Sequence, residues 1–131
     1  MKVQNHLSLL IIALFLNSNL AISQNISTTK KVSSSIEVIQ FHSEHRCMTC
    51  NKIEDYTKET LNQYVKIPFT LVNVDDVKNE KKAEKFEATG TALFLHDTKT
   101  GKKKDLTDFA FMNASNKEKF IKGLKKEIDQ F

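Results

Sequence analysis

The stretch IEVIQFHSEHRCMTC, residues 36–50, decides the fold of this 131-residue chain. Its first six residues are β-branched and apolar on both faces, which is typical of a strand covered on two sides. The remaining nine hold the only two cysteines of the sequence, Cys47 and Cys50, in a C-x-x-C spacing. A helix is predicted to begin at Cys47. The stretch therefore predicts a buried strand that leads within a few residues into a helix with a cysteine at its N-terminus.

The first 23 residues have the order of a secretory signal peptide. Lys2 precedes an almost uninterrupted apolar run over residues 7–16, and a small-x-small ending follows at residues 21–23. An apolar core of about ten residues is too short to span a bilayer, so no permanent membrane anchor is expected. We expect an exported protein, periplasmic or extracellular, with a disordered lead-in over residues 24–35 and one domain over residues 36–131.

The charge pattern argues against nucleic acid as a partner. The chain has 20 lysines and arginines against 16 acidic residues, a formal net charge of +4. The lysines alternate with acids instead of clustering, and aromatic residues are not interleaved with them. This pattern indicates a solvated surface, and nucleic-acid binding is not expected.

Hydrophobic periodicity and turn residues divide residues 36–131 into strands and helices. The absence of Gly and Pro favours a helix over residues 47–65, which Pro68 is expected to stop. The predicted elements are strands at residues 36–41, 69–74, 92–95 and 102–106, and helices at residues 47–65, 77–86 and from 115 onward. The order β-α-β-α-β-β-α predicts an α/β fold with a four-stranded mixed sheet and helices on both of its faces.

The last helix has the clearest pattern. Ser115 and Glu118 fit a capping box, and Phe120, Leu124 and Ile128 recur at helical spacing as a buried stripe. The apolar segment before this helix, residues 105–112, has no clear period. We therefore assign it to neither a helix nor a strand.

The C-x-x-C at the start of the first helix, directly after the first buried strand and in this element order, resembles the thioredoxin-like fold. The resemblance covers residues 36–131. Within that superfamily, residues 41–42, 46–51 and 105–112 look like those of the small exported ArsF-type family, whose members are named as subunits of a nitroreductase acting on nitrophenyl compounds. The resemblance implies a redox protein or a nitroreductase subunit as the partner.

The sequence also departs from ordinary thioredoxins at several positions. Arg46 stands where they have tryptophan, and Met48-Thr49 stands where they have Gly-Pro. Their buried acid, six residues before the first cysteine, corresponds to Phe41. Their cis-proline would fall near Thr91-Ala92, where this chain has no proline. A general protein disulfide reductase is therefore not expected.

The predicted position of the cysteines assigns each a role. A thiolate at a helix N-terminus is stabilised by unpaired backbone N–H groups and the helix dipole, so Cys47 is predicted to be the attacking thiol with a lowered pKa. His45 and Arg46 add positive charge and are predicted to tune it. Cys50 is predicted to be the resolving thiol. The sequence therefore predicts thiol-disulfide exchange or electron transfer to a partner, a possible oxidoreductase activity that needs no cofactor.

Two other interpretations use the same residues. In one, the cysteines form an inert bridge on a non-catalytic accessory module. In the other, His42, His45, Cys47 and Cys50 offer four nitrogen and sulfur donors to a tetrahedral zinc or a soft copper ion. The spacing H-x2-H-x-C-x2-C is not a common zinc pattern, so this metal site is the weaker alternative.

Overall fold

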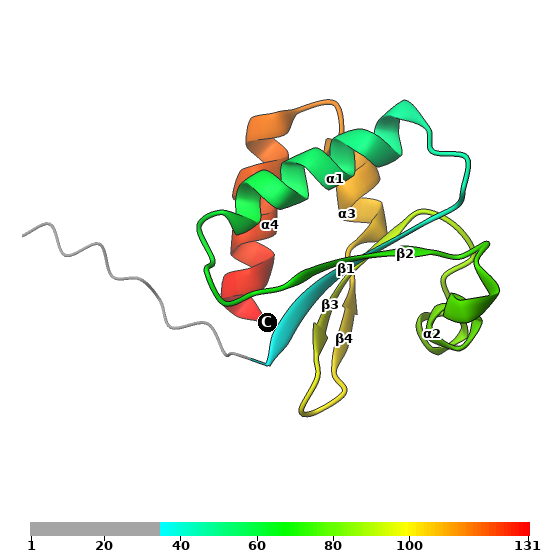
Figure 1. Ribbon diagram of the computed structural model, residues 1–131. Helices are drawn as coiled ribbons and strands as arrows, with labels where there is room; N and C mark the ends of the chain where they lie inside the picture. Colours follow the sequence, from blue (N-terminus) through cyan, green and yellow to red (C-terminus); the bar gives the residue numbers. More distant parts are fainter. Residues whose placement is uncertain (1–34) are drawn as a thin grey trace, which may run out of the picture.

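The computed structural model describes residues 35–131, so the predicted signal peptide and nearly all of the predicted lead-in lie outside the described residues. In chain order the elements are β1 (Ile36–His42), α1 (Met48–Leu61), β2 (Phe69–Asn73), the 3-10 turn η2 (Val77–Asn79), α2 (Glu80–Phe86), β3 (Ala92–Asp97), β4 (Lys103–Asp105), α3 (Thr107–Asn113) and α4 (Lys117–Gln130). Figure 1 shows their arrangement.

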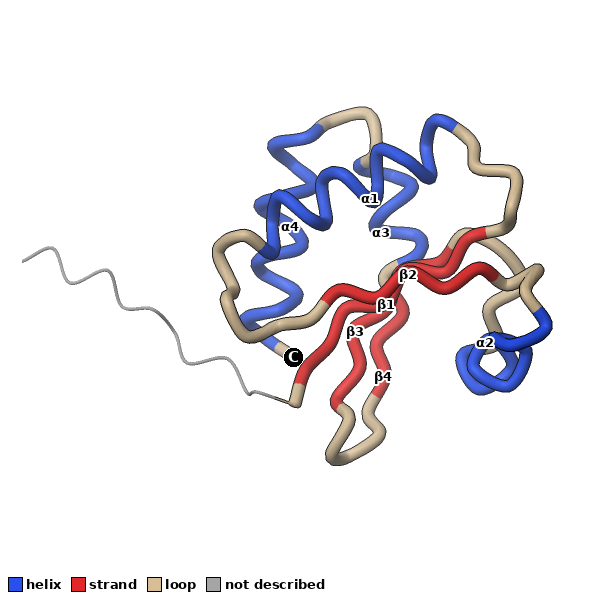
Figure 2. The backbone as a smooth tube through the Cα atoms, viewed as in Figure 1, coloured by secondary structure: helices blue, strands red, loops and turns tan. Residues whose placement is uncertain are grey.

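The four strands form one open mixed sheet in the order β2-β1-β3-β4 (Figure 2). Strand β1 pairs in parallel with β2, where Phe41 lies opposite Val72, and antiparallel with β3, where Ile39 lies opposite Phe94. Strands β3 and β4 form an antiparallel hairpin. The predicted α/β class and the predicted four-stranded mixed sheet are therefore confirmed.

Alternate residues of β1 supply cores on the two faces of the sheet. Val38 packs with residues of α1, α3 and α4 in the larger core, whereas Ile39 and Phe41 pack with α2 in the smaller one. Helices α1, α3 and α4 accordingly cover one face and α2 alone covers the other (Figure 1). The prediction of helices on both faces is confirmed. The start of α1 follows the largely buried strand β1 after a loop of residues 43–47.

The predicted strand ends differ from the structure by no more than two residues, and the further differences concern the helices. Helix α1 ends at Leu61, four residues before the predicted end, because the chain then turns through N–H bonds from Gln63 and Tyr64. The segment without a clear period contains α3, whose only fully buried residue is Ala110. Asn116, instead of Ser115, caps α4 by accepting a hydrogen bond from the N–H of Lys119.

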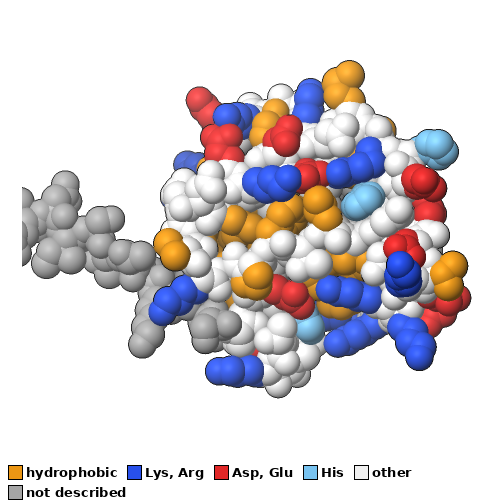
Figure 3. Space-filling view, viewed as in Figure 1, with side chains coloured by type: hydrophobic (Ala, Val, Ile, Leu, Met, Phe, Trp, Pro, Cys, Tyr) orange, Lys and Arg blue, Asp and Glu red, His pale blue; other side chains and the backbone are white. Residues whose placement is uncertain are grey.

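The surface agrees with the charge pattern of the sequence. Basic and acidic side chains are interspersed over the face seen in Figure 3, with hydrophobic side chains near its centre. None of the helices within residues 35–131 is long and apolar enough to cross a membrane.

Candidate functional site

Cys47 caps the N-terminus of α1. It has extended backbone geometry, with φ −80° and ψ 165°, and its side chain accepts a hydrogen bond from the backbone N–H of Cys50 at 3.4 Å. This position usually holds Ser, Thr, Asp or Asn, whose oxygen satisfies one of the N–H groups that the first helical turn leaves free. Here a sulfur takes that role, and the side chain remains exposed.

The helix terminus lowers the pKa of the Cys47 thiol. The largest cause is the hydrogen bond from the N–H of Cys50, which stabilises the thiolate. Slight burial opposes it, and the backbone N–H and hydroxyl of Thr49 add to the lowering. The shift has the predicted direction, and its largest causes lie in the first helical turn instead of in His45 and Arg46.

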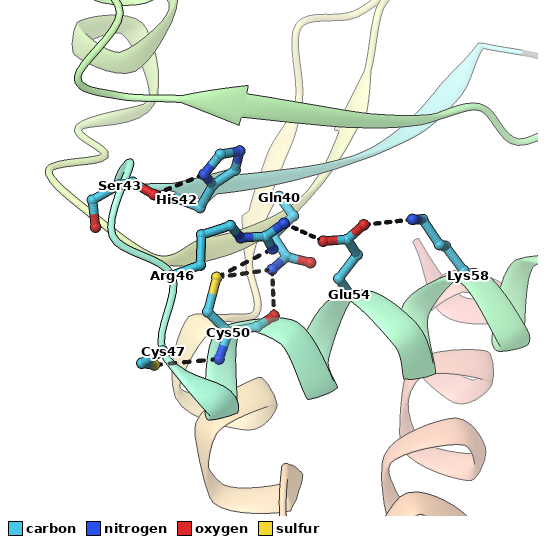
Figure 4. Close-up of polar contacts among 8 residues, drawn as sticks. All are labelled: Gln40, His42, Ser43, Arg46, Cys47, Cys50, Glu54 and Lys58. Carbon is cyan, nitrogen blue, oxygen red and sulfur yellow. Dashed lines mark hydrogen bonds and ion pairs between the residues drawn. The ribbon is translucent and has the colours of Figure 1, made fainter.

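Cys50 lies one turn further along α1 in entirely different surroundings. It is 1% exposed, and its sulfur accepts from Gln40 Nε2 at 3.6 Å and from Arg46 Nη2 at 3.4 Å (Figure 4). Gln40 is fully buried on β1, and its Nε2 also donates to the carbonyl oxygen of Cys50 at 3.0 Å. Strand β1 and the loop after it therefore hold this cysteine through both its side chain and its backbone.

Arg46 joins Cys50 to a chain of charges along α1. Its Nη1 lies 2.5 Å from Glu54 Oε2, and the other carboxylate oxygen of Glu54 pairs with Lys58 one turn later. Burial raises the pKa of Glu54, but the two cations outweigh it and the net shift is downward. Burial likewise lowers the pKa of Arg46, and the contacts with Cys50 and Glu54 reverse this and raise it overall. Both groups are therefore held in their charged forms.

The predicted tuning residues separate in the structure. His45 is exposed, and Arg46 directs its guanidinium to Cys50 and Glu54. His42, at the end of β1, places Nδ1 2.9 Å from the carbonyl oxygen of Ser43 (Figure 4). Of the residues proposed to adjust the thiol chemistry, only Arg46 contacts a cysteine, and that cysteine is Cys50.

The prediction of thiol-disulfide exchange or electron transfer through a Cys47–Cys50 pair is contradicted by the structure. Both cysteines are free thiols, one exposed and the other buried, so they do not form the bridge on which the prediction depended. The buried sulfur is also held by an amide and a guanidinium. The nitroreductase-associated role and the inert bridge of an accessory module depended on the same pair and are corrected with it.

The alternative metal site is also wrong. Within residues 35–131, no group of three or more His, Cys, Asp or Glu side chains is arranged to hold a metal ion. The reason is visible at the four predicted donors. Cys50 lies inside, His45 and Cys47 are exposed, and His42 faces a backbone carbonyl.

Two residues of this site were missed by sequence reasoning. Gln40 is the only fully buried polar side chain of β1, and Glu54 is a buried acid on α1. The comparison with thioredoxins directed attention to Phe41, which instead packs against Phe86 and Phe94. A glutamine within an apolar strand was the available signal, because a polar group in such a strand must find a partner once buried.

The site therefore combines one accessible thiol, stabilised as a thiolate by a helix terminus, with a second thiol that is enclosed and hydrogen-bonded. Such an arrangement permits nucleophilic chemistry at Cys47 and withholds Cys50 from solvent. No protein-family model matches the chain, and no curated protein matches it either.

Proposed function

We propose that the protein acts through a single nucleophilic thiolate, Cys47, which captures soft electrophiles such as activated alkenes. One observation carries the proposal: the exposed sulfur of Cys47 accepts the N–H of Cys50 at the start of α1. The thiolate is the reactive form of cysteine, and a soft, polarizable sulfur reacts readily with soft electrophilic carbon. A lowered pKa gives more of that form near neutral pH without a neighbouring base.

The reaction is an addition that needs no further reactant. The Cys47 thiolate donates an electron pair to the β-carbon of the alkene, a sulfur–carbon bond forms, and the π bond breaks. The α-carbon then takes a proton from water. Met48 is 74% exposed beside the thiol, so its side chain can contact an apolar substituent of the electrophile.

The proposal includes the setting of this chemistry. We propose a thioredoxin-like fold for residues 36–131, which is supported by the parallel β1–β2 pair, the β3–β4 hairpin and a cysteine at the start of α1. Export rests on the signal-peptide pattern of the first 23 residues. Membership of the ArsF-type family and the identity of a partner protein stay predictions.

Labelling with N-ethylmaleimide tests the nucleophile. The folded protein should take up one label, at Cys47, with a rate that rises with pH to a midpoint below the ordinary thiol pKa of about 8.5. Cys47→Ser should abolish fast labelling, and Cys50→Ser should retain it. Peptide mass spectrometry locates the label. A midpoint at or above the ordinary value, or a label on Cys50, would overturn the proposal.

A further inference from the structure

Two side chains contact Cys50 from outside its own helical turn, and a third side chain holds one of these two. Gln40 reaches it from β1, with 3.0 Å to the carbonyl oxygen and 3.6 Å to the sulfur. Arg46 reaches the sulfur from the loop between β1 and α1 at 3.4 Å. Glu54, on the next turn of α1, holds the other side of that guanidinium at 2.5 Å. In Figure 4, Gln40 and Arg46 converge on the sulfur of Cys50, and Glu54 lies on the other side of the guanidinium.

The same residue supplies the N–H that contacts Cys47. Since the backbone of Cys50 donates to Cys47 Sγ, any movement of Cys50 also moves the group that stabilises the exposed thiolate. The buried amide oxygen of Gln40 has no hydrogen-bond partner within residues 35–131, so Gln40 contributes here through its donor group alone. Its position is therefore explained by the two bonds to Cys50.

We propose that Gln40, Arg46 and Glu54 are positioning residues that make the protein selective between its two thiols: they enclose Cys50 and fix its N–H on Cys47. The consequence at Cys47 rests on the proposed function, whereas the enclosure of Cys50 does not. Buried groups react with solvent reagents through local opening, so the labelling rate of Cys50 reports how firmly these contacts hold it.

The test labels Cys50 in a Cys47→Ser background, where a serine at the same position can still cap the helix. N-ethylmaleimide should label Cys50 at least tenfold faster in Glu54→Gln and in Gln40→Leu than in the parent. The matched control is Glu59→Gln on the same helix, which removes an equal charge from an exposed pair with Lys117. In this control, the labelling rate of Cys50 should stay within twofold of the rate in the parent.

The second measurement uses variants that retain Cys47. Glu54→Gln should move the pH midpoint of Cys47 labelling upward, because a loosened Cys50 donates less well to the thiolate. The pH midpoint of Cys47 labelling in Arg46→Lys should lie between those of the wild type and Arg46→Ala, since one ammonium cannot bridge Cys50 and Glu54 as a guanidinium does. Loss of packing alone predicts no upward shift in Glu54→Gln, because glutamine has almost the same volume as glutamate.

The outcomes are separable. Unchanged Cys50 labelling in both Glu54→Gln and Gln40→Leu, or an equal rise in Glu59→Gln, overturns the inference. If Gln40→Leu does not fold, Gln40→Met and Arg46→Lys decide in its place, with circular dichroism to establish folding. If the pH midpoint of Cys47 labelling in the wild-type protein is not lowered, the proposed function is wrong. The Cys47→Ser series still decides whether Cys50 is enclosed as described.

Discussion

Three helices cover one face of the sheet, whereas a single helix of seven residues covers the other. The larger core contains residues of α1, α3 and α4, with Phe120 fully buried at its centre. The smaller core is an aromatic cluster of Phe41, Phe86 and Phe94, with ring centroids 5.2–5.8 Å apart. The two faces also differ in the side chains at their solvent-facing margins.

Long cationic side chains cover part of the smaller core on its solvent side. Lys85 and Lys103 lie over the ring of Phe86, with Nζ 5.8 and 5.2 Å from its centroid, and His96 packs against the ring edge. Such side chains bury their aliphatic parts and keep the charge in water. The larger face has one such contact at its margin, where Lys102 Nζ lies 4.4 Å from the ring centroid of Phe131. The candidate site lies at the start of α1, which packs in the larger core, so the site depends mainly on the three-helix side.

The largest predicted effect is the loss of stability caused by a substitution in the larger core. Phe120→Ala removes a ring that contacts Tyr56 and Phe109, and should lower the free energy of unfolding by about 4 kcal/mol. Phe86→Ala should cost about 3 kcal/mol, because lysine side chains and water can fill part of the space. Urea denaturation measures both. Only Phe120→Ala should also speed the labelling of Cys50, and the reverse result would contradict the dependence of the site on this face.

A smaller effect tests how tightly the larger core is packed at Gly123. A Cβ added at Gly123 would lie 2.4 Å from a ring carbon of Phe109, which is itself packed against Phe120. Overpacking should outweigh the better helix propensity of alanine, so Gly123→Ala should lose about 1 kcal/mol. In a Phe109→Ala background the same change should be neutral or stabilising. Equal effects in both backgrounds would show that the two positions are not in contact.

The smallest effect concerns pH. Burial, followed by the charge of Asp129, raises the pKa of Tyr64 to about 12, and its hydroxyl donates to Asp129 Oδ1 at 3.2 Å. An unfolded tyrosine ionises near 10. The Tyr64 hydroxyl therefore stays protonated to a higher pH in the folded state than in the unfolded state. Its contribution to the free energy of unfolding is fully present below about pH 10 and is lost as pH rises toward 12. Tyr64→Phe should flatten the fall in unfolding free energy over that window, and identical slopes would contradict it.

The sequence was sufficient where a hydrophobic pattern was long or two-sided. Residues 36–41 were apolar on both faces and form a central strand, and the stripe of Phe120, Leu124 and Ile128 is buried as predicted. Helix α3 was missed because seven residues with one fully buried position leave too little periodicity. Its existence depends on packing against α4 and β3, which the pattern of its own seven residues does not contain.

The candidate site was predicted only as far as local structure determines it. A cysteine at a helix N-terminus follows from the chain order, so the lowered pKa of Cys47 could be expected. The enclosure of Cys50 could not, since it depends on Gln40 of the neighbouring strand and on which way Arg46 turns. Arg46 lies next to Cys47 in sequence, but the carboxylate of Glu54 draws its guanidinium inward.

The open sheet also has a bearing on self-association. Its two outer strands leave backbone groups unpaired, and such edges can recruit a strand from another copy. Strand β4 is three residues long and carries Lys103 and Lys104, both of which discourage that pairing. Strand β2 has five residues and an exposed Leu71. Strand-to-strand aggregation of this protein should therefore begin at β2, where a single lysine in place of Leu71 would give the edge the same protection.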